Sequence, residues 1–141
     1  MRYETELSPV SHVSHGLDAK PGSGGRTIPN VTCQVIDVET KAALGANAEG
    51  EILIKGPGVM QGYLNNPKAT AETIDHNGWL HTGDIGYFDE DGYLFIVDRL
   101  KELIKFKGFQ VAPAEIEAAL MAHPDIGDAG VIGVADKDAG E

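Results

Sequence analysis

The sequence has little positive charge and only one cysteine. Of its 141 residues, 11 are Lys or Arg and 22 are Asp or Glu, which gives a formal net charge of -11 at pH 7. Such a chain lacks the broad basic surface that neutralises phosphates, so we expect it to bind neither nucleic acid nor an anionic membrane. Because Cys33 is the single cysteine, no internal disulfide is possible, and we expect a reducing compartment.

Long apolar runs are also missing from the sequence. No run approaches the roughly 20 apolar residues of a membrane-spanning helix, and the first residues lack the apolar region of a signal peptide. We therefore expect no membrane span and an intracellular location, either cytoplasmic or peroxisomal. The hydrophobic content of 42% and the charged content of 23% fit a folded globular protein.

The first half of the chain is predicted to contain loops and strands. Residues 8–31 are rich in Ser, Pro, Gly and His and are predicted to be loop. Within them, PGSGGR (21–26) lacks the Gly-Lys-Ser/Thr ending of a phosphate-binding loop. Apolar residues alternate over 32–38 and 50–56, which predicts two strands.

Turn and cap residues predict a helix and a hairpin. Asn66 and Pro67 suit the N-cap and first position of a short helix. YFDEDGYLFIVD (87–98) places two aromatic and β-branched runs around an acidic turn that ends at Gly92, which predicts a β-hairpin.

The pattern changes after Asp98. ELIKF (102–106) is predicted to be a short strand, and APAEIEAALMAHP (112–124) a helix with Pro113 in its first turn. That helix carries an apolar stripe of Ile116, Ala119 and Leu120. DAGVIGVAD (128–136) is predicted to be a buried strand.

Positive charge is concentrated in one segment, DRLKELIKFKGFQ (98–110), which contains Arg99, Lys101, Lys105 and Lys107. One interpretation is an edge strand whose lysines discourage pairing with other chains. The other is a site for a phosphate or carboxylate, to which Arg99 could offer a bidentate contact. The composition alone leaves both interpretations open.

GWLHTGDIGY (78–87) also has two interpretations. In the first it is a turn in which the side chains of Thr82 and Asp84 bond to the local backbone. In the second, glycine turns position Asp84 to accept hydrogen bonds from sugar hydroxyls, as acidic residues do with ribose.

Three long segments together resemble the adenylate-forming superfamily, in particular the branch that holds 4-coumarate–CoA ligases, acyl-CoA synthetases and beetle luciferases. They are GEILIKGPGVMQGYLNNPKAT (50–70), GWLHTGDIGYFDEDGYLFIVDRLKELIKFKGFQVAPAEIEAAL (78–120) and HPDIGDAGVIGVAD (123–136). The resemblance covers nearly the whole chain in one register, with the family's motifs in the family's order.

The resemblance implies an α+β fold, with a distorted β-barrel subdomain followed by part of a small α/β domain. Residues 1–97 would end the large AMP-binding domain, and residues 98–141 would form the hinge and the first part of the small C-terminal domain. It also implies a two-step reaction. ATP and a small carboxylic acid give an acyl-adenylate with Mg²⁺ present, and coenzyme A then displaces AMP after the small domain rotates.

The resemblance assigns roles to individual residues. Asp84 would hold the ribose hydroxyls of ATP or AMP, with Arg99 assisting, and Asp98 would be the hinge. Lys105 and Gln110 would act in the thioester-forming step, and Gly108 would lie near coenzyme A, where a missing side chain allows close approach. Thr5 would contact the α-phosphate of the nucleotide, and Glu6 would bind Mg²⁺.

Alternatives to a ligase remain. The resemblance equally fits a luciferase-like monooxygenase as the parent enzyme, and a non-catalytic binding domain could use the same scaffold. The family's phosphate loop is expected before residue 1, and its adenylating lysine after residue 141. We therefore expect this chain to be inactive alone and to need the rest of the parent enzyme as its partner.

Overall fold

The computed structural model describes residues 2–3, 5–8, 10–14, 16, 19–100, 103–106 and 109–134. The chain divides into two compact units, Met1–Ile96 and Val97–Glu141. The division falls within one strand, one residue before the domain boundary expected from the sequence. The assignment of these units to two domains of a larger enzyme stays a prediction.

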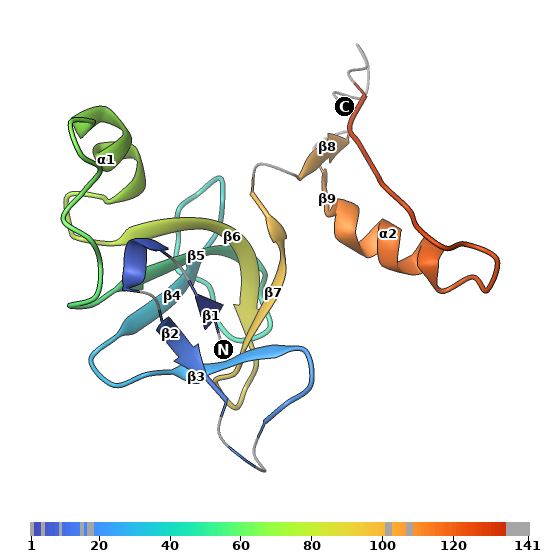
Figure 1. Ribbon diagram of the computed structural model, residues 1–141, viewed down its shortest axis with the longest axis horizontal. Coiled ribbons are helices and arrows are strands. Elements are labelled where there is room, and N and C mark those ends of the chain that lie inside the picture. The colour runs from blue at the N-terminus through green and yellow to red at the C-terminus, as the bar shows by residue number, and fades with distance from the viewer. Residues whose placement is uncertain are drawn as a thin grey trace. The chain divides into compact units, whose positions relative to one another are not determined.

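Strands predominate in the first unit, and the second unit contains the longer of the two α-helices found among the described residues (Figure 1). In chain order the elements are β1 (Arg2–Tyr3), the 3₁₀ helix η1 (Thr5–Leu7), β2 (Val10–Val13), β3 (Ser23–Thr27), β4 (Thr32–Ile36), β5 (Gly50–Lys55), α1 (Pro67–Thr73), β6 (Leu80–Phe88), β7 (Leu94–Arg99), β8 (Ile104–Phe106), β9 (Phe109–Val111) and α2 (Pro113–Met121).

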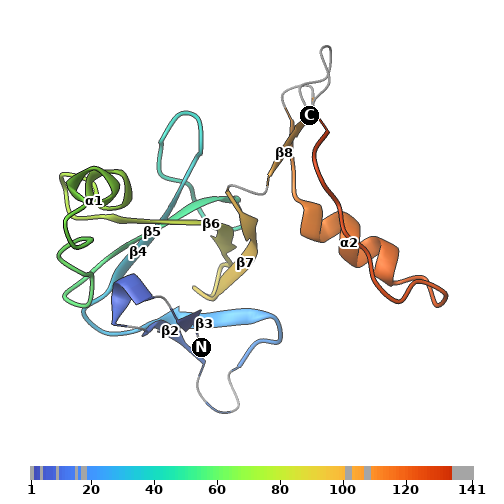
Figure 2. The same ribbon diagram turned by 45° about the horizontal axis from the view of Figure 1, so that its top comes forward.

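A single curled sheet forms the body of the first unit. Its seven strands lie in the order β1-β2-β3-β7-β6-β5-β4, and β6 follows a marked curve in both ribbon views (Figures 1 and 2). Together with the helices this confirms the predicted α+β class, a distorted β-barrel subdomain followed by part of a small α/β domain.

The core of this unit lies against β5, which is the strand next to the edge strand β4 of the sheet. Glu51, Ile52, Leu53 and Ile54 are all buried, because β5 pairs with β4 on one side and with β6 on the other. The core cluster consists of Leu7, Val35, Ile52, Ile54, Leu80 and Leu94. The segments that adjoin β5, including β6, are therefore anchored to a strand that cannot shift without disturbing a packed core.

Four sequence predictions for the first unit are confirmed. The strands expected over 32–38 and 50–56 are β4 and β5, and the expected hairpin is β6 and β7, which are neighbours in the sheet. The expected helix is α1, where Asn66 Oδ1 accepts a hydrogen bond from Ala69 N at 3.1 Å and Pro67 is the first helical residue.

The prediction of a loop over residues 8–31 is wrong, because this segment contributes β2 and β3. Ser11 and His12 are fully buried, and Thr27 Oγ1 lies 3.1 Å from His12 Nε2 across the two strands. PGSGGR likewise ends in strand. A Cβ on Gly25 would lie 2.2 Å from the carbonyl carbon of Val13, so glycine is required by the close approach of two strands.

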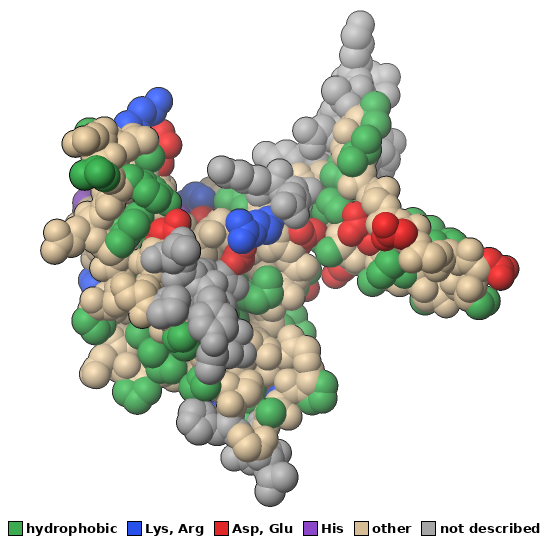
Figure 3. Space-filling model, viewed as in Figure 1, with side chains coloured by type: hydrophobic (Ala, Val, Ile, Leu, Met, Phe, Trp, Pro, Cys, Tyr) green, Lys and Arg blue, Asp and Glu red, His purple; other side chains and the backbone are tan. Residues whose placement is uncertain are grey.

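The second unit contains the hairpin β8–β9 and α2. The strand expected over 102–106 is present as β8, and α2 begins at Pro113 as predicted. Figure 3 shows apolar side chains and carboxylates side by side on the face of α2 in view. Among the described residues, the only sheet that lies wholly within this unit is the two-stranded one, β8–β9.

The prediction of a buried strand over 128–136 is wrong for the part that the structure describes. Residues 128–134 are in no strand, and the side chains of Ile132 and Val134 are 80% and 70% exposed. The N–H of Val131 donates to Glu117 Oε1 at 2.9 Å, so this amide bonds to a side chain of α2 rather than to a neighbouring strand. The prediction rested on apolar content alone, but a strand also needs a neighbouring strand to pair with, and residues 128–134 pair with none.

No helix in the described part of the chain is long and apolar enough to cross a membrane.

Candidate nucleotide site

Asp84 lies on an irregular stretch of β6. Glu51 of β5 pairs with Ile85, but Leu53 pairs with His81, so the three residues 82–84 lie opposite Ile52 alone. This arrangement is a β-bulge, which re-aims side chains relative to a regular strand. Asp84 is 6% exposed, so its carboxylate is held within the protein rather than free in solvent.

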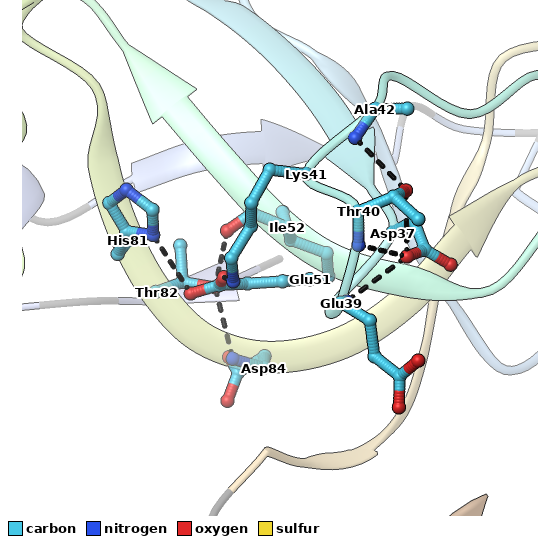
Figure 4. Close-up of polar contacts among 10 residues, drawn as sticks. All are labelled: Asp37, Glu39, Thr40, Lys41, Ala42, Glu51, Ile52, His81, Thr82 and Asp84. Carbon is cyan, nitrogen blue, oxygen red and sulfur yellow. Dashed lines mark hydrogen bonds and ion pairs between the residues drawn. The ribbon is translucent and has the colours of Figure 1, made fainter.

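The hydroxyl of Thr82 makes two hydrogen bonds at the bulge. Thr82 Oγ1 donates to the carbonyl oxygen of Ile52 at 2.8 Å and accepts from the N–H of Asp84 at 3.1 Å (Figure 4). Gly83, between them, has φ +69°, a left-handed conformation that other residues rarely adopt. The segment is thus an irregular strand rather than a turn, but the bond that the first interpretation expected between the Thr82 side chain and the local backbone is present.

A buried carboxylate fixes the residue before the bulge. Glu51 is 3% exposed, and its Oε1 lies 3.1 Å from His81 Nδ1. Its Oε2 lies 3.6 Å from Lys41 Nζ, so a histidine and a lysine both approach the same carboxylate (Figure 4). Sequence analysis missed Glu51, although a charged residue inside the apolar run GEILIKG was a visible signal that a partner is needed.

Glu6 belongs to η1 and contacts a distant part of the first unit. Tyr63 Oη donates to Glu6 Oε1 at 3.0 Å, and the N–H of Met60 donates to the carbonyl of Glu6 at 2.8 Å. The hydrogen bond to the carboxylate raises the pKa of Tyr63. No motif or pattern in the sequence pointed to Tyr63.

The backbone of Thr5 is also in η1. Within the described residues, no group of three or more His, Cys, Asp or Glu side chains could hold a metal ion. The contact of Thr5 with phosphate and of Glu6 with Mg²⁺ therefore remain predictions.

Asp98 is bonded to the start of α2 within the second unit. Its Oδ1 accepts from the N–H of Arg99 at 2.7 Å, and its Oδ2 accepts from the N–H of Ala114 at 3.4 Å. Ala112, the N-cap residue, provides no side-chain hydrogen bond to the helix. Asp98, which is 8% exposed, therefore supplies the cap from another element.

Lys105 and Gln110 are brought together by the hairpin. Their Cα positions are direct partners in the β8–β9 register, between the pairs Ile104–Val111 and Phe106–Phe109. Gly108, Lys101 and Lys107 lie outside the described residues. Arg99 is an exposed residue at the end of β7 in the second unit, whereas Asp84 belongs to the first.

Comparison with known proteins shows similarity along nearly the whole chain. A family model described as AMP-binding enzyme matches residues 4–64. The chain is 63% identical to a luciferin 4-monooxygenase of Luciola mingrelica and 55% identical to a 4-coumarate–CoA ligase of Narcissus pseudonarcissus. Each match covers 97% of this chain and 25% of the relative.

Solved structures give the same result. The crystal structure of ATP-bound MatB from Rhodopseudomonas palustris matches 99% of this chain and 28% of that one, with a TM-score of 0.87 and 38% identity. The chain thus spans about a quarter of the length of these two curated relatives. By sequence and by fold, this chain belongs to the adenylate-forming superfamily of AMP-binding enzymes.

Proposed function

We propose that this chain is part of an acid–thiol ligase that activates a small carboxylic acid with ATP and transfers the acyl group to coenzyme A. The observation that carries the proposal is Asp84, a buried residue on a bulge of β6 whose N–H donates a hydrogen bond to the Thr82 hydroxyl. A carboxylate in a fixed position accepts hydrogen bonds from two vicinal hydroxyls, which is the chemistry that ribose offers.

In this proposal the two units divide the work of two half-reactions. Asp84 in the first unit orients the nucleotide through its ribose, and Arg99 adds a guanidinium for the nucleotide side. Attack of the substrate carboxylate on the α-phosphate forms the acyl-adenylate and releases pyrophosphate. The thiol of coenzyme A then attacks the acyl carbon, the thioester forms, and AMP leaves.

The second unit serves the thioester step. Lys105 and Gln110, opposed in the β8–β9 register, would face the reacting acyl group after rotation about Asp98, with Gly108 close to coenzyme A. The capping bond from Asp98 to α2 supports the idea that the residue moves together with the second unit. The parent enzyme is proposed to act inside the cell, in the cytoplasm or in peroxisomes.

Glu6 is a suitable residue for holding Mg²⁺. This ion is usually bound by one or two carboxylates together with substrate phosphates, so a dedicated cluster of acidic residues is not needed. When bound, Mg²⁺ neutralises charge on the phosphates. Tyr63 holds the Glu6 side chain through its hydroxyl, and Thr5 in the same helical turn would contact the α-phosphate.

A luciferase-like monooxygenase is the second candidate for the parent enzyme. The identity of 63% to a luciferin 4-monooxygenase specifically favours it. Both candidates require the same adenylate-forming step, so the nucleotide roles proposed for Asp84 and Arg99 are shared. The two differ in what happens to the acyl-adenylate.

Titration of AMP into the chain, followed by amide NMR, tests nucleotide binding. We expect the amides around Asp84 to shift at millimolar AMP, and we expect Asp84→Asn to abolish the response. An absence of any shift near Asp84 and Arg99 would contradict nucleotide contact by this chain and favour a non-catalytic scaffold.

Assays of the full-length enzyme then distinguish the two candidates. A ligase forms the thioester from the acyl-adenylate and coenzyme A, and Lys105→Ala should slow this step while adenylation continues. Light emission from luciferin without thioester formation would instead support the monooxygenase. An unchanged thioester step in Lys105→Ala would remove Lys105 from the proposed machinery.

A further inference from the structure

At the bulge in β6, the Thr82 hydroxyl makes hydrogen bonds to backbone groups where the regular pairing between β5 and β6 is interrupted. A bulge leaves backbone groups without their usual cross-strand partners, and buried N–H and C=O groups need a hydrogen bond. Here the hydroxyl donates to the carbonyl of Ile52 and accepts from the N–H of Asp84, at 2.8 Å and 3.1 Å. A hydroxyl can do both at once, because it has one donor and two acceptor lone pairs.

The bulge changes the direction of one short segment and leaves its flanks in register. Between the pairs Leu53–His81 and Glu51–Ile85, β5 has one residue and β6 has three, an excess of two. Because strand side chains alternate with a period of two, an even excess keeps His81 and Ile85 on their proper faces. Only the segment 82–84 is re-aimed, and it carries Asp84.

The residues on either side of the bulge, His81 and Ile85, are both fixed by their pairing with β5. His81 is bonded to the buried Glu51, and Ile85, which pairs with Glu51, is itself only 4% exposed. Figure 4 shows Thr82 between the strand that carries Glu51 and Ile52 and the residue Asp84. With both ends fixed, the remaining freedom of the segment lies at Thr82–Gly83, and the Thr82 hydroxyl restrains it.

We propose that Thr82 is a positioning residue: its hydroxyl holds the backbone of Asp84 so that the carboxylate meets the vicinal hydroxyls of a ribose, and it thereby sets the preference for ribose over deoxygenated sugars. This inference rests on the proposed function of Asp84. Thr82 itself contacts no substrate and acts through the backbone of Asp84.

The test compares AMP with 2′,3′-dideoxy-AMP on the full chain by NMR titration. We expect Thr82→Val to weaken AMP binding about tenfold, the equivalent of one lost hydrogen bond, and to leave the dideoxy nucleotide unaffected. Thr82→Ser, which keeps the hydroxyl, should retain the wild-type preference.

Hydrogen exchange provides a second readout that does not depend on a ligand. Loss of the acceptor should speed exchange of the Asp84 amide in Thr82→Val but not in Thr82→Ser. Thr27→Val is the matched control, since Thr27 is also a half-buried strand threonine whose hydroxyl makes a hydrogen bond, in this case to His12. It should change neither the Asp84 amide nor the ribose preference.

Each outcome bears on one proposal. If the wild-type chain does not distinguish AMP from the dideoxy nucleotide, the role of Asp84 fails and the positioning role fails with it. If the wild-type chain distinguishes them and Thr82→Val does so equally well, only the positioning role is overturned. Equal weakening of both nucleotides would show that Thr82 is merely structural, which also overturns it.

Discussion

The two units of this chain stabilise their candidate functional residues in different ways. In the first unit Asp84 lies on β6, beside β5. Three apolar side chains of these two strands, Ile52, Ile54 and Leu80, are almost completely buried. In the described part of the second unit, the large apolar side chains of α2 are partly in solvent, with Ile116 39% exposed and Leu120 43% exposed. The stripe predicted on this helix is therefore present in the sequence but is not buried here.

The difference shows what each kind of site needs. A carboxylate that orients a nucleotide gains from a rigid backbone, which a core and a bonded bulge provide. The role proposed for the second unit in the thioester step would need local order without fixed attachment, which a short hairpin with a capped helix can provide. The first unit is thus expected to be sensitive to core changes, and the second to changes in its few polar bonds.

The largest expected effect comes from matched leucines in the two units. Leu94 is fully buried and Leu120 is 43% exposed. Leu94→Ala should lower the free energy of unfolding of the first unit by about 3 kcal/mol, because it removes packed methyl groups and leaves a cavity. Leu120→Ala should change stability by no more than about 0.5 kcal/mol.

Urea unfolding followed by Trp79 fluorescence measures the first unit, since this is the chain's single tryptophan and it precedes β6. Hydrogen exchange of α2 amides reports the second. If Leu94→Ala and Leu120→Ala destabilise their units equally, the difference in packing inferred from the exposed fractions of the two leucines is contradicted.

The sequence predicted best where a signal is local. Asn66 and Pro67 define the start of α1 within two adjacent residues, and the acidic turn ending at Gly92 defines the hairpin. It failed for β3, whose pairing partner Phe95 lies far along the chain from Ser23. A Ser- and Gly-rich segment becomes a strand there because a partner strand is present, which local composition does not reveal.

In the candidate site, too, local signals were visible in the sequence and long-range contacts were not. The motif containing Asp84 was identified through its resemblance to a family, but the bulge that aims it depends on a mismatch in pairing between β5 and β6. Glu51 and Tyr63 were missed because their roles come from contacts with His81 and Glu6, 30 and 57 positions away. Such pairs become visible only when the fold brings distant segments together.

A smaller effect is expected from the helix cap in the second unit. Asp98→Ala removes the carboxylate that accepts from Ala114 N, and the loss of a cap typically costs about 1 kcal/mol. The α2 amides should therefore exchange faster, while Trp79-detected unfolding of the first unit stays unchanged. Asp98→Asn, whose amide oxygen can still accept, should retain most of the protection. Unaltered exchange in Asp98→Ala would show that the cap does not stabilise α2.

The smallest expected effect is a dependence of the first unit on acid pH through Asp75. Its Oδ1 accepts from the N–H groups of Asn77 and Trp79, both at 2.9 Å, and so fixes the turn before β6. Burial alone would raise the pKa of Asp75, but the hydrogen bonds from Trp79 and Asn77 outweigh it and lower the pKa below its usual value. The folded protein thus favours the charged form.

The sign of the pH effect follows from this shift. Because the pKa of Asp75 is lower in the folded chain than in the unfolded chain, its contribution to stability is complete above the unfolded value of about 3.9 and is lost as the pH falls through the folded value. Asp75→Asn should therefore lower stability at pH 7 and flatten its fall in acid, in Trp79-detected unfolding. Glu90→Gln, an exposed change in the same unit, controls for the loss of one negative charge. If stability falls equally steeply in acid for Asp75→Asn and wild type, the fall is due to other carboxylates of the first unit. The turn before β6 would then be ordered by backbone hydrogen bonds alone.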